Sequence, residues 1–411
     1  MLSVLRSTAY RNLFTAQVVA LLGTGLLTVA LGLLAFDLAG ERAGAVLGTA
    51  LTIKMIAYVL VAPVMAAAIE RLPRKVVLVA ADGVRAVIAL SLPFLDQVWQ
   101  VYVLVFLLQS ASATFTPAFQ ALIPLVLPAE KDYTRALSLS RLAYDVESLV
   151  SPLLAAALLS VLSYSDLFLG TMLGFLASSL MVLVTRLPVI PAVADQGSLL
   201  HRTTLGTRIF LQEPSLRGLL ALNLVVAAAT ALVLVNTVVY ARNLFPGTNT
   251  DVALALAVYG AGSMLVAFLA PRALESIPDR TFMLIGAVIL PAGVLGAAVV
   301  AGSGSPWWLF LALWTVLGVG TSMISTPSSR LLRRVATDAT RGFLFTAQFS
   351  LSHACFMLTY PIAGWVGAAA GQPVAALCLA VLATGGTVAA LVSWPAAGTA
   401  PAARSEARAG R

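Results

Sequence analysis

The sequence predicts an all-α membrane protein in which twelve transmembrane helices form two six-helix bundles. Of its 411 residues, 60% are hydrophobic and only 10% are charged, a composition typical of chains embedded in lipid. Apolar windows of roughly 18 or more residues recur along the chain, each long enough to cross the hydrocarbon core as a helix. Short motifs also recur about half a chain apart, which indicates that the second bundle repeats the first.

Six apolar spans lie in the first half of the chain. They cover residues 12–38, 45–69, 76–95, 99–122, 137–162 and 166–187. Six more follow in the second half, over residues 217–244, 252–274, 282–301, 307–326, 342–367 and 374–394. The first span is much longer than the core of a signal peptide, so we expect it to stay attached to the protein.

These spans divide the chain into four parts. Residues 1–187 and 217–394 are the predicted six-helix bundles, and residues 188–216 connect them on the cytoplasmic side. The second, basic part of the connector reads as a short amphipathic helix. Residues 395–411 consist mostly of Ala, Pro, Gly and Arg, and we expect a disordered cytoplasmic tail.

Four pairs of short segments support the repeat, because they match in the same order at nearly one offset. The paired segments are 11–19 with 217–225, 69–75 with 274–280, 116–117 with 326–327, and 134–135 with 340–341. In the second pair, Pro73 aligns with Pro278 and Lys75 with Arg280. Six spans per repeat give both halves the same orientation in the membrane.

The distribution of the 25 Lys and Arg residues predicts the orientation. With the N-terminus in the cytoplasm, only Arg42 and Arg242 fall in outer loops and only Lys54, Arg85 and Arg141 fall within spans. Both termini are therefore predicted to be cytoplasmic, in the inner (cytoplasmic) membrane. The net charge of +8 is then explained by the orientation of the protein in the membrane. No compact basic domain that could bind nucleic acid is predicted.

Two six-helix halves with a basic turn between the second and third spans resemble the major facilitator superfamily of secondary transporters over the whole chain. In that family the turn is a glycine-aspartate-basic motif, and here it reads Ala67-Ala-Ile-Glu70-Arg71-Leu-Pro73-Arg74-Lys75. Ala replaces the leading glycine and Glu70 lies near the acidic position. The resemblance implies structural or gating roles for Glu70, Arg71, Arg74 and Lys75, in a monomer with neither enzymatic activity nor a cofactor.

Within the superfamily, residues 79–86, 115–124 and 134–140 resemble the branch that holds enterobactin exporters, macrolide efflux pumps and nickel-resistance permeases. Residues 48–58 and 138–147 look most like the nickel-resistance group. The resemblance implies export of nickel or a related divalent cation by proton antiport and alternating access. Two departures are the missing His-rich tail and Ser151-Pro152-Leu-Leu-Ala-Ala-Ala in place of the antiporter glycine run.

Two alternatives to metal export remain. One is export of an amphipathic organic molecule, such as a macrolide or a siderophore. The other is a membrane receptor or scaffold that transports nothing, which the lack of a sizeable predicted domain outside the membrane disfavours. The three lysines, Lys54, Lys75 and Lys131, lie in no phosphate-binding loop, so a gradient and not a nucleotide is expected to supply the energy.

Four ionisable residues are predicted near the middle of the membrane: Lys54, Arg85, Glu147 and His353. Lys54 lies nine residues in from the outer end of its span and Glu147 ten residues in from the inner end of its span, roughly 14 Å deep at the rise of an α-helix. Arg85 and His353 come out at a similar depth. A charged side chain at that depth costs about 2.5 to 3.5 kcal/mol on insertion scales, so each one needs a partner, water or a function.

Two pairs of intramembrane charges lie one turn apart on their own helices. Asp82 lies three residues before Arg85 and Arg141 four before Asp145, so both pairs are predicted to be structural. Lys54 and Glu147 have no such partner. Either they form a static contact between helices, or Glu147 is a proton or cation site and Lys54 its competitor or gate. A third alternative is that Lys54 extends to the outer interface.

Further polar residues are candidates for the pathway. Gln17 and Asn223 occupy matching positions on spans one and seven, and Tyr144 lies on the face of span five that carries Glu147. His353 and Met357 share a helical face and are weak candidate metal ligands, because imidazole suits nickel but a thioether is softer than nickel prefers. His353 can equally be an ordinary membrane histidine with its hydrogen bonds satisfied.

Overall fold

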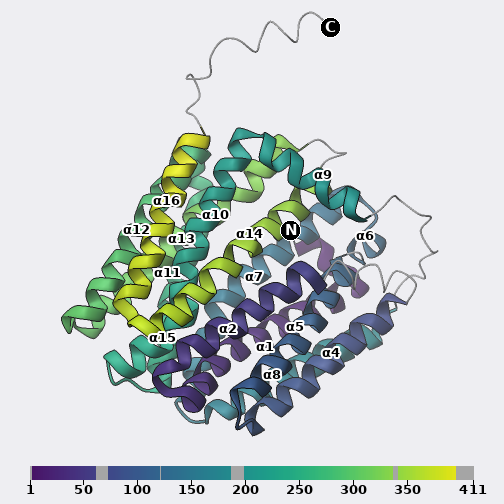
Figure 1. Ribbon diagram of the computed structural model, residues 1–411. Coiled ribbons are helices and arrows are strands. Elements are labelled where there is room, and N and C mark those ends of the chain that lie inside the picture. Colours follow the sequence, from purple (N-terminus) through teal and green to yellow (C-terminus); the bar gives the residue numbers. More distant parts are fainter. Residues whose placement is uncertain (1, 62–72, 121, 187–198, 337–340, 395–411) are drawn as a thin grey trace, which may run out of the picture.

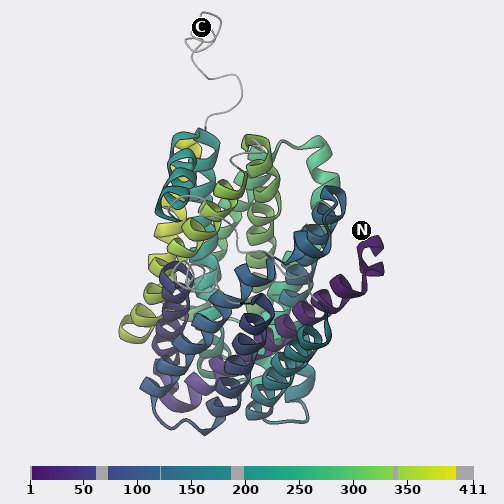
Figure 2. The ribbon, with the colours of Figure 1, turned by 90° about the vertical axis from the view of Figure 1, so that its right-hand side faces the viewer.

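The computed structural model describes residues 2–61, 73–120, 122–186, 199–336 and 341–394. In these ranges every regular element is a helix, and the long helices pack side by side as one bundle (Figure 1). The view turned by 90° shows the same helices running between two opposite faces (Figure 2). The expected all-α fold is confirmed.

The described residues of the first half form six long helices. They are α1 (Thr8–Ala39), α2 (Ala43–Ile56), α4 (Arg74–Ser91), α5 (Val98–Gln120), α7 (Glu130–Leu159) and α8 (Tyr164–Val184). Short helical turns lie between them: η1 (Leu2–Arg6), η2 (Gly40–Arg42), η3 (Ala57–Val61), η4 (Leu92–Phe94) and α6 (Ile123–Val126). We call this set the N-half.

The second half repeats the pattern after a connecting helix, α9 (Leu199–Gln212). The long helices are α10 (Pro214–Val239), α11 (Asn249–Ser276), α12 (Asp279–Ser303), α13 (Trp307–Val335), α14 (Arg341–Pro361) and α16 (Gln372–Ser393). The short elements are η5 (Tyr240–Leu244), η6 (Ile362–Val366) and α15 (Gly367–Ala370). Helices α10 to α16 are the C-half.

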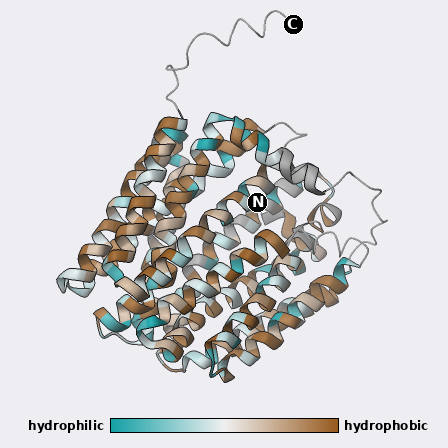
Figure 3. Cartoon of the chain, viewed as in Figure 1, coloured by the Kyte–Doolittle hydropathy of each residue, from teal (hydrophilic) through white to brown (hydrophobic). Residues whose placement is uncertain are grey.

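Helices lie in all twelve of the predicted ranges, and hydrophobic residues dominate their length (Figure 3). Among the described residues, nine segments are long and apolar enough to cross a membrane, and the first, Thr8–Val61, holds two of the predicted spans. The ranges that contain α7 and α14 are not among the nine. For these two the crossing stays a prediction.

Several helices extend beyond the apolar ranges. Helix α7 begins at Glu130, before the predicted residue 137, and α13 continues past residue 326 to Val335 with Pro327 inside it. The added turns carry charged residues such as Arg333 and Arg334. An apolar window marks the part of a helix that meets lipid, whereas the helix itself continues as long as its backbone hydrogen bonds are formed.

The bundle has two ends that we name by their landmarks. The connector face carries α9 and the end of α16, and the far face carries η2 and α15 (Figure 1). At the far face, capping boxes begin α8 and α11: Ser163 pairs with Asp166, and Thr248 with Asp251. Each box satisfies backbone N–H groups that the first helical turn leaves free.

The two halves make equivalent contacts at the connector face. Lys75 Nζ donates to the carbonyl oxygen of Thr185 at 3.0 Å, and Arg280 Nε donates to that of Trp394 at 2.7 Å. Thr185 and Trp394 are the C-cap residues of α8 and α16. A basic side chain is favourable there because it binds the negative end of the helix. The alignment of Lys75 with Arg280 therefore has a structural basis.

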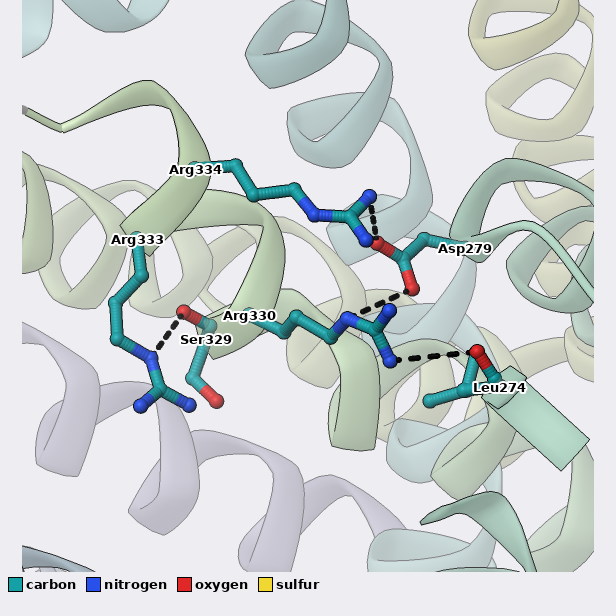
Figure 4. A network of polar contacts seen from close by, with 6 residues as sticks. All are labelled: Leu274, Asp279, Ser329, Arg330, Arg333 and Arg334. Atoms are coloured by element: carbon teal, nitrogen blue, oxygen red, sulfur yellow. Dashed lines mark hydrogen bonds and ion pairs between the residues drawn. The ribbon is translucent and has the colours of Figure 1, made fainter. Parts of the chain in front are cut away.

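An ion-pair network ties the ends of three C-half helices at the connector face (Figure 4). Asp279, at the start of α12, forms ion pairs with Arg334 Nη1 at 2.6 Å and Arg330 Nε at 3.5 Å from α13. Arg330 Nη1 also lies 3.5 Å from the carbonyl oxygen of Leu274 on α11. Asp279 is only 3% exposed, so its charge depends on these two guanidinium groups.

The two halves meet closely toward the far face. Gly48 of α2 packs against Gly364 of η6: a Cβ atom on Gly48 would lie 2.7 Å from the carbonyl oxygen of Tyr360 and 3.0 Å from Gly364 Cα. Nearby, Trp365 Nε1 donates to Thr49 Oγ1 at 2.8 Å. Such close crossing between helices needs residues without side chains. The N-half and the C-half are thus in direct contact where α2 meets η6.

Candidate functional site

A small cavity marks the centre of the bundle. It is lined by side chains of α1, α2, α5 and α10, among them Thr24, Thr28, Lys54, Gln109 and Leu234. Its volume is about 20 Å³, which is room for one water molecule. Because α10 belongs to the C-half, the cavity lies where the two halves meet.

Lys54 projects from α2 into this region. Its Nζ lies 5.7 Å from the centroid of the Tyr58 ring, one helical turn along the chain. That distance is within the range of a cation–π interaction. The ammonium group therefore packs against the aromatic ring of Tyr58.

The backbone changes its winding immediately after Lys54. Helix α2 ends at Ile56 and a π-helical turn, η3, carries Tyr58. Wide turns of this kind re-aim side chains and occur frequently at functional sites in helical proteins.

Glu147 lies on α7 and faces α1. A Cβ atom on Gly25 of α1 would lie 2.6 Å from Glu147 Oε1 and would also overlap Ser151. The carboxylate reaches this place only because residue 25 has no side chain. The opposite charges of Glu147 and Lys54 attract one another, yet these two described residues form no ion pair.

An aromatic cluster stands beside Lys54 and joins the two halves. It consists of Tyr58 from η3 and of Phe349 and His353 from α14. The ring centroids of Tyr58 and His353 are 5.5 Å apart, those of Tyr58 and Phe349 6.2 Å, and those of Phe349 and His353 4.1 Å. Phe349 keeps 45% of its surface exposed, and Tyr144 of α7, which lies within electrostatic range of Tyr58, keeps 39%. This surface can pack against an apolar molecule.

The His353 ring makes a hydrogen bond to the backbone of its own helix. Its Nδ1 donates to the carbonyl oxygen of Phe349 at 2.6 Å. Within the part of the chain that the structure describes, no three His, Cys, Asp or Glu side chains gather as a metal site. His353, which with Met357 is a metal candidate, therefore belongs to no such group of three.

Asp82 and Arg85 pair on α4, as their spacing predicts, and both are buried. The Arg85 guanidinium lies between the rings of Phe115 and Phe175, with its Cζ 4.4 Å from each centroid. A planar guanidinium between two aromatic faces is well accommodated away from water. The arrangement braces α4 against α5 and α8.

Gln17 and Asn223 make corresponding bonds in the two halves. Ser140 Oγ on α7 donates to Gln17 Oε1 at 2.9 Å. Asn223 and Gln348 exchange two hydrogen bonds, at 3.1 and 3.2 Å, between α10 and α14. Both amides are buried. They hold helices together next to the candidate site.

Some predicted residues lie outside what the structure describes. Glu70 and Arg71 fall in the gap at residues 62–72. Arg141 and Asp145 lie on the described helix α7, but their side chains are not described. Arg74 begins α4 and is partly buried. The structure thus bears on Lys54, Glu147, Tyr144, Gln17, Asn223 and His353, and it places Lys54, Glu147, Tyr144 and His353 in one region.

The sequence analysis did not single out Tyr58, Phe349 and Gly25. Tyr58 follows Lys54 by four residues and Phe349 precedes His353 by four, a spacing that puts side chains on one helical face. That signal was available for the two pairs. No signal in the sequence pairs Gly25 with Glu147, because that contact depends on how α1 crosses α7.

Comparisons with known proteins agree with this architecture. A family model, Major Facilitator Superfamily, matches residues 13–245. The chain is 28% identical to macrolide efflux protein A of Enterococcus faecalis over 152 residues, or 34% of this chain and 47% of that protein. It is 26% identical to macrolide efflux protein A of Streptococcus pyogenes over 184 residues, or 44% of this chain and 45% of that protein. The chain thus matches about half the length of these relatives.

Solved structures resemble nearly the whole chain. Nucleoside transporter NupG gives a TM-score of 0.70 at 14% identity, covering 95% of this chain and 100% of that one. A bacterial homolog of the human lysosomal transporter Spinster, inward-facing and unoccupied, gives 0.74 at 12% identity, covering 94% and 96%. A D-xylose–proton symporter gives 0.67 at 13% identity, covering 95% and 96%. At such low identity the likeness shows the fold alone.

Proposed function

This chain belongs to the Major Facilitator Superfamily, and from that premise we propose that it is a secondary active transporter that exports an amphipathic organic molecule by proton antiport. Its fold is that of solved transporters and not of an enzyme. The observation that carries the proposal is the combination of an acidic side chain, Glu147, with an aromatic cluster between the two halves.

The aromatic cluster supports an organic substrate. Phe349, which contacts the Tyr58 ring, and Tyr144 leave 45% and 39% of their surfaces exposed. Aromatic faces bury apolar surface and attract a positively charged amine. The partial likeness to two macrolide efflux proteins points the same way. A lipophilic molecule with a basic nitrogen would engage both the rings and the carboxylate.

Nickel or a related divalent cation is the substrate that the resemblance to nickel-resistance permeases implies. It has less support, because the described residues hold no cluster of three ionisable ligands and His353 Nδ1 is already bonded to a carbonyl oxygen. A borderline cation such as nickel would need several nitrogen or oxygen donors around it. We therefore place the organic molecule first.

Glu147 would couple export to protons. In the proposed cycle its carboxylate holds the cationic part of the substrate while the site faces the cytoplasm. A proton from the outside then neutralises the carboxylate, and the substrate leaves. One site that binds either a proton or a cation exchanges the two across the membrane when its access alternates. Exchange of one proton for one monovalent cation moves no net charge, so the pH difference drives it: two pH units supply about 2.7 kcal/mol, enough for a solute gradient of about a hundredfold.

Alternating access would use the contact between the halves. We assign the connector face to the cytoplasm, since Lys and Arg favour that side, and we place the protein in the cytoplasmic membrane as a monomer. The contact of Gly48 with Gly364 and the bond of Trp365 to Thr49 would then close the outer end. Export requires these contacts to separate, so that the site opens outward.

The experiment is transport by the purified full chain in lipid vesicles. A pH gradient is imposed, and the movement of a radiolabelled macrolide and of ⁶³Ni²⁺ is followed with and without the protein. The proposal predicts gradient-driven movement of the macrolide and none of nickel. Movement of nickel alone would reverse the choice of substrate. Movement of neither, with binding retained, would favour a receptor or scaffold.

A further inference from the structure

We propose that Lys54 is a tethered stand-in for the cationic group of the substrate: without substrate its ammonium occupies the ring face of Tyr58, and a lipophilic organic cation takes that place when it binds. The inference rests on the proposed function, because it concerns how the same site selects its substrate. It makes Lys54 a specificity-determining residue that acts by competition.

The position of the ammonium group supports this. Lys54 Nζ lies 5.7 Å from the Tyr58 centroid, where a quaternary ammonium would sit in an aromatic site. The Tyr58 ring also contacts Phe349 and His353, so the lysine reaches the edge of the aromatic cluster. The protein therefore carries its own cation on the surface that is best suited to hold a foreign one.

Charge balance supports it as well. The ionisable groups that face Lys54 are Glu147 from α7, Tyr58 from its own helix segment and His353 from α14. Glu147 attracts Lys54 but is not locked to it by an ion pair. Lys54 offsets the charge of the carboxylate from a distance when the site is empty, with little contribution to stability, and it remains free to move when another cation arrives.

Space is the third argument. Lys54 lines a cavity of about 20 Å³, which holds one water molecule and no organic ligand. A substrate with an amine must therefore displace the lysine side chain or open the bundle around it. A flexible four-carbon stem suits this, since it can swing toward Gln109 and the threonines of α1 that line the same cavity.

The inference predicts selectivity by charge. A lipophilic cation competes with Lys54 for both Tyr58 and Glu147, whereas a neutral molecule of similar shape competes for space only. Removal of the lysine charge then improves the binding of cations and leaves the binding of neutral analogues nearly unchanged. Replacement of the lysine by arginine keeps the competition.

The test measures equilibrium binding of two probes to the purified full chain by titration calorimetry. One probe is tetraphenylphosphonium, a permanent lipophilic cation, and the other is triphenylphosphine oxide, a neutral molecule with similar rings. The proteins are wild type, Lys54→Met, Lys54→Arg, and Lys54→Met combined with Tyr58→Leu. Gel filtration and thermal unfolding confirm that each variant is folded, and Lys54→Arg controls for the substitution itself.

We expect Lys54→Met to bind the cation about tenfold more tightly than wild type, with the neutral probe changed by less than about twofold. Adding Tyr58→Leu should remove roughly 2- to 30-fold of cation affinity, the range of a cation–π contact. Equal improvement for both probes would mean that Lys54 only fills space. Weaker cation binding, or no binding of either probe by any variant, would also overturn the inference.

Vesicle transport separates this result from the proposed function. If wild type moves the macrolide under a pH gradient but Lys54→Met shows no gain for the cation, the inference fails and the function stands. If Lys54→Met shows the gain but no variant transports, the selectivity stands and the proposed function fails.

Discussion

The carboxylate of Glu147 occupies the space that a side chain on Gly25 of α1 would fill, because an added Cβ atom would lie 2.6 Å from Oε1. Real Cβ atoms do not approach an oxygen that closely. Glu147, the acidic residue of the proposed site, therefore fits only because residue 25, on a helix far away in the sequence, has no side chain.

Gly25→Ala should disturb this contact. The methyl group would meet Ser151 as well as Glu147, so α1 and α7 must separate or the carboxylate must move. Overpacking of this kind costs about 1 to 3 kcal/mol. We expect a lower unfolding temperature in detergent together with impaired transport.

Gly83→Ala is the matched control. Gly83 lies within α4, and no atom is found within 4 Å of the position of an added Cβ. The substitution should leave stability unchanged or raise it by up to about 1 kcal/mol, because alanine favours a helix. If both substitutions had the same effect, the contact between Gly25 and Glu147 would not be the cause.

Lys54 and Glu147 are expected to act as a switch and not as a strut. The two residues attract one another but form no ion pair. Removal of either charge should therefore lower the free energy of unfolding by nearly the same amount whether or not the other charge is present. A double-mutant cycle with Lys54→Met and Glu147→Gln measures both properties. We expect stability changes that add within about 0.5 kcal/mol and transport rates that do not add. Strong coupling in stability alone would identify a strut.

Asp279→Asn should loosen the connector face of the C-half. Asp279 is 3% exposed and holds Arg334 and Arg330, which are themselves 57% and 42% exposed. The neutral side chain would leave Arg330 and Arg334 without their negative partner. We expect the free energy of unfolding to fall by about 1 to 2 kcal/mol, measured by thermal unfolding. Asp132→Asn is the control. Its pair with Arg135 is about 35–40% exposed on both sides and should contribute less than about 1 kcal/mol.

Gly48→Leu should favour an open far face. The new side chain would collide with the carbonyl oxygen of Tyr360 and with Gly364, so α2 cannot return to η6. The reporter is a cysteine at Thr28, which lines the central cavity, with Cys355 and Cys378 changed to serine. A maleimide that cannot cross membranes should label it at least about tenfold faster, equivalent to a shift of about 1.4 kcal/mol between two states.

Gly83→Leu serves as the control for labelling, since that position is open. Equal labelling rates in the two variants would mean that the contact between Gly48 and Gly364 does not close the pathway.

Much of the fold follows from the sequence by local physics. Hydrophobic windows identify the spans because backbone N–H and C=O groups must be hydrogen-bonded in lipid. Within a single segment only a helix satisfies them. The pairing of Asp82 with Arg85 follows from helical spacing, and the alignment of Lys75 with Arg280 follows from the repeat. In the structure Asp82 and Arg85 form an ion pair, and Lys75 and Arg280 each donate to the carbonyl oxygen of a helix C-cap residue.

The candidate site could be predicted only in part. Lys54 and Glu147 stand out because isolated charges in apolar spans are costly. Their environment depends on how helices from both halves cross: Tyr58 meets His353 across the interface, and Glu147 meets Gly25 across α1 and α7. Close contacts of this kind depend on small residues at a few crossings, and no periodicity in the sequence marks which glycine faces which partner.

The central claim is that Glu147 carries the exchange of protons for substrate, and one vesicle measurement tests it most directly. Wild type, Glu147→Gln and Glu41→Gln are reconstituted at equal amounts, and uphill movement of the macrolide is driven by a pH gradient. Glu41 is exposed at the far face and controls for loss of a carboxylate. We predict gradient-driven transport by wild type and Glu41→Gln and none by Glu147→Gln, whereas uphill transport retained by folded Glu147→Gln would contradict the account.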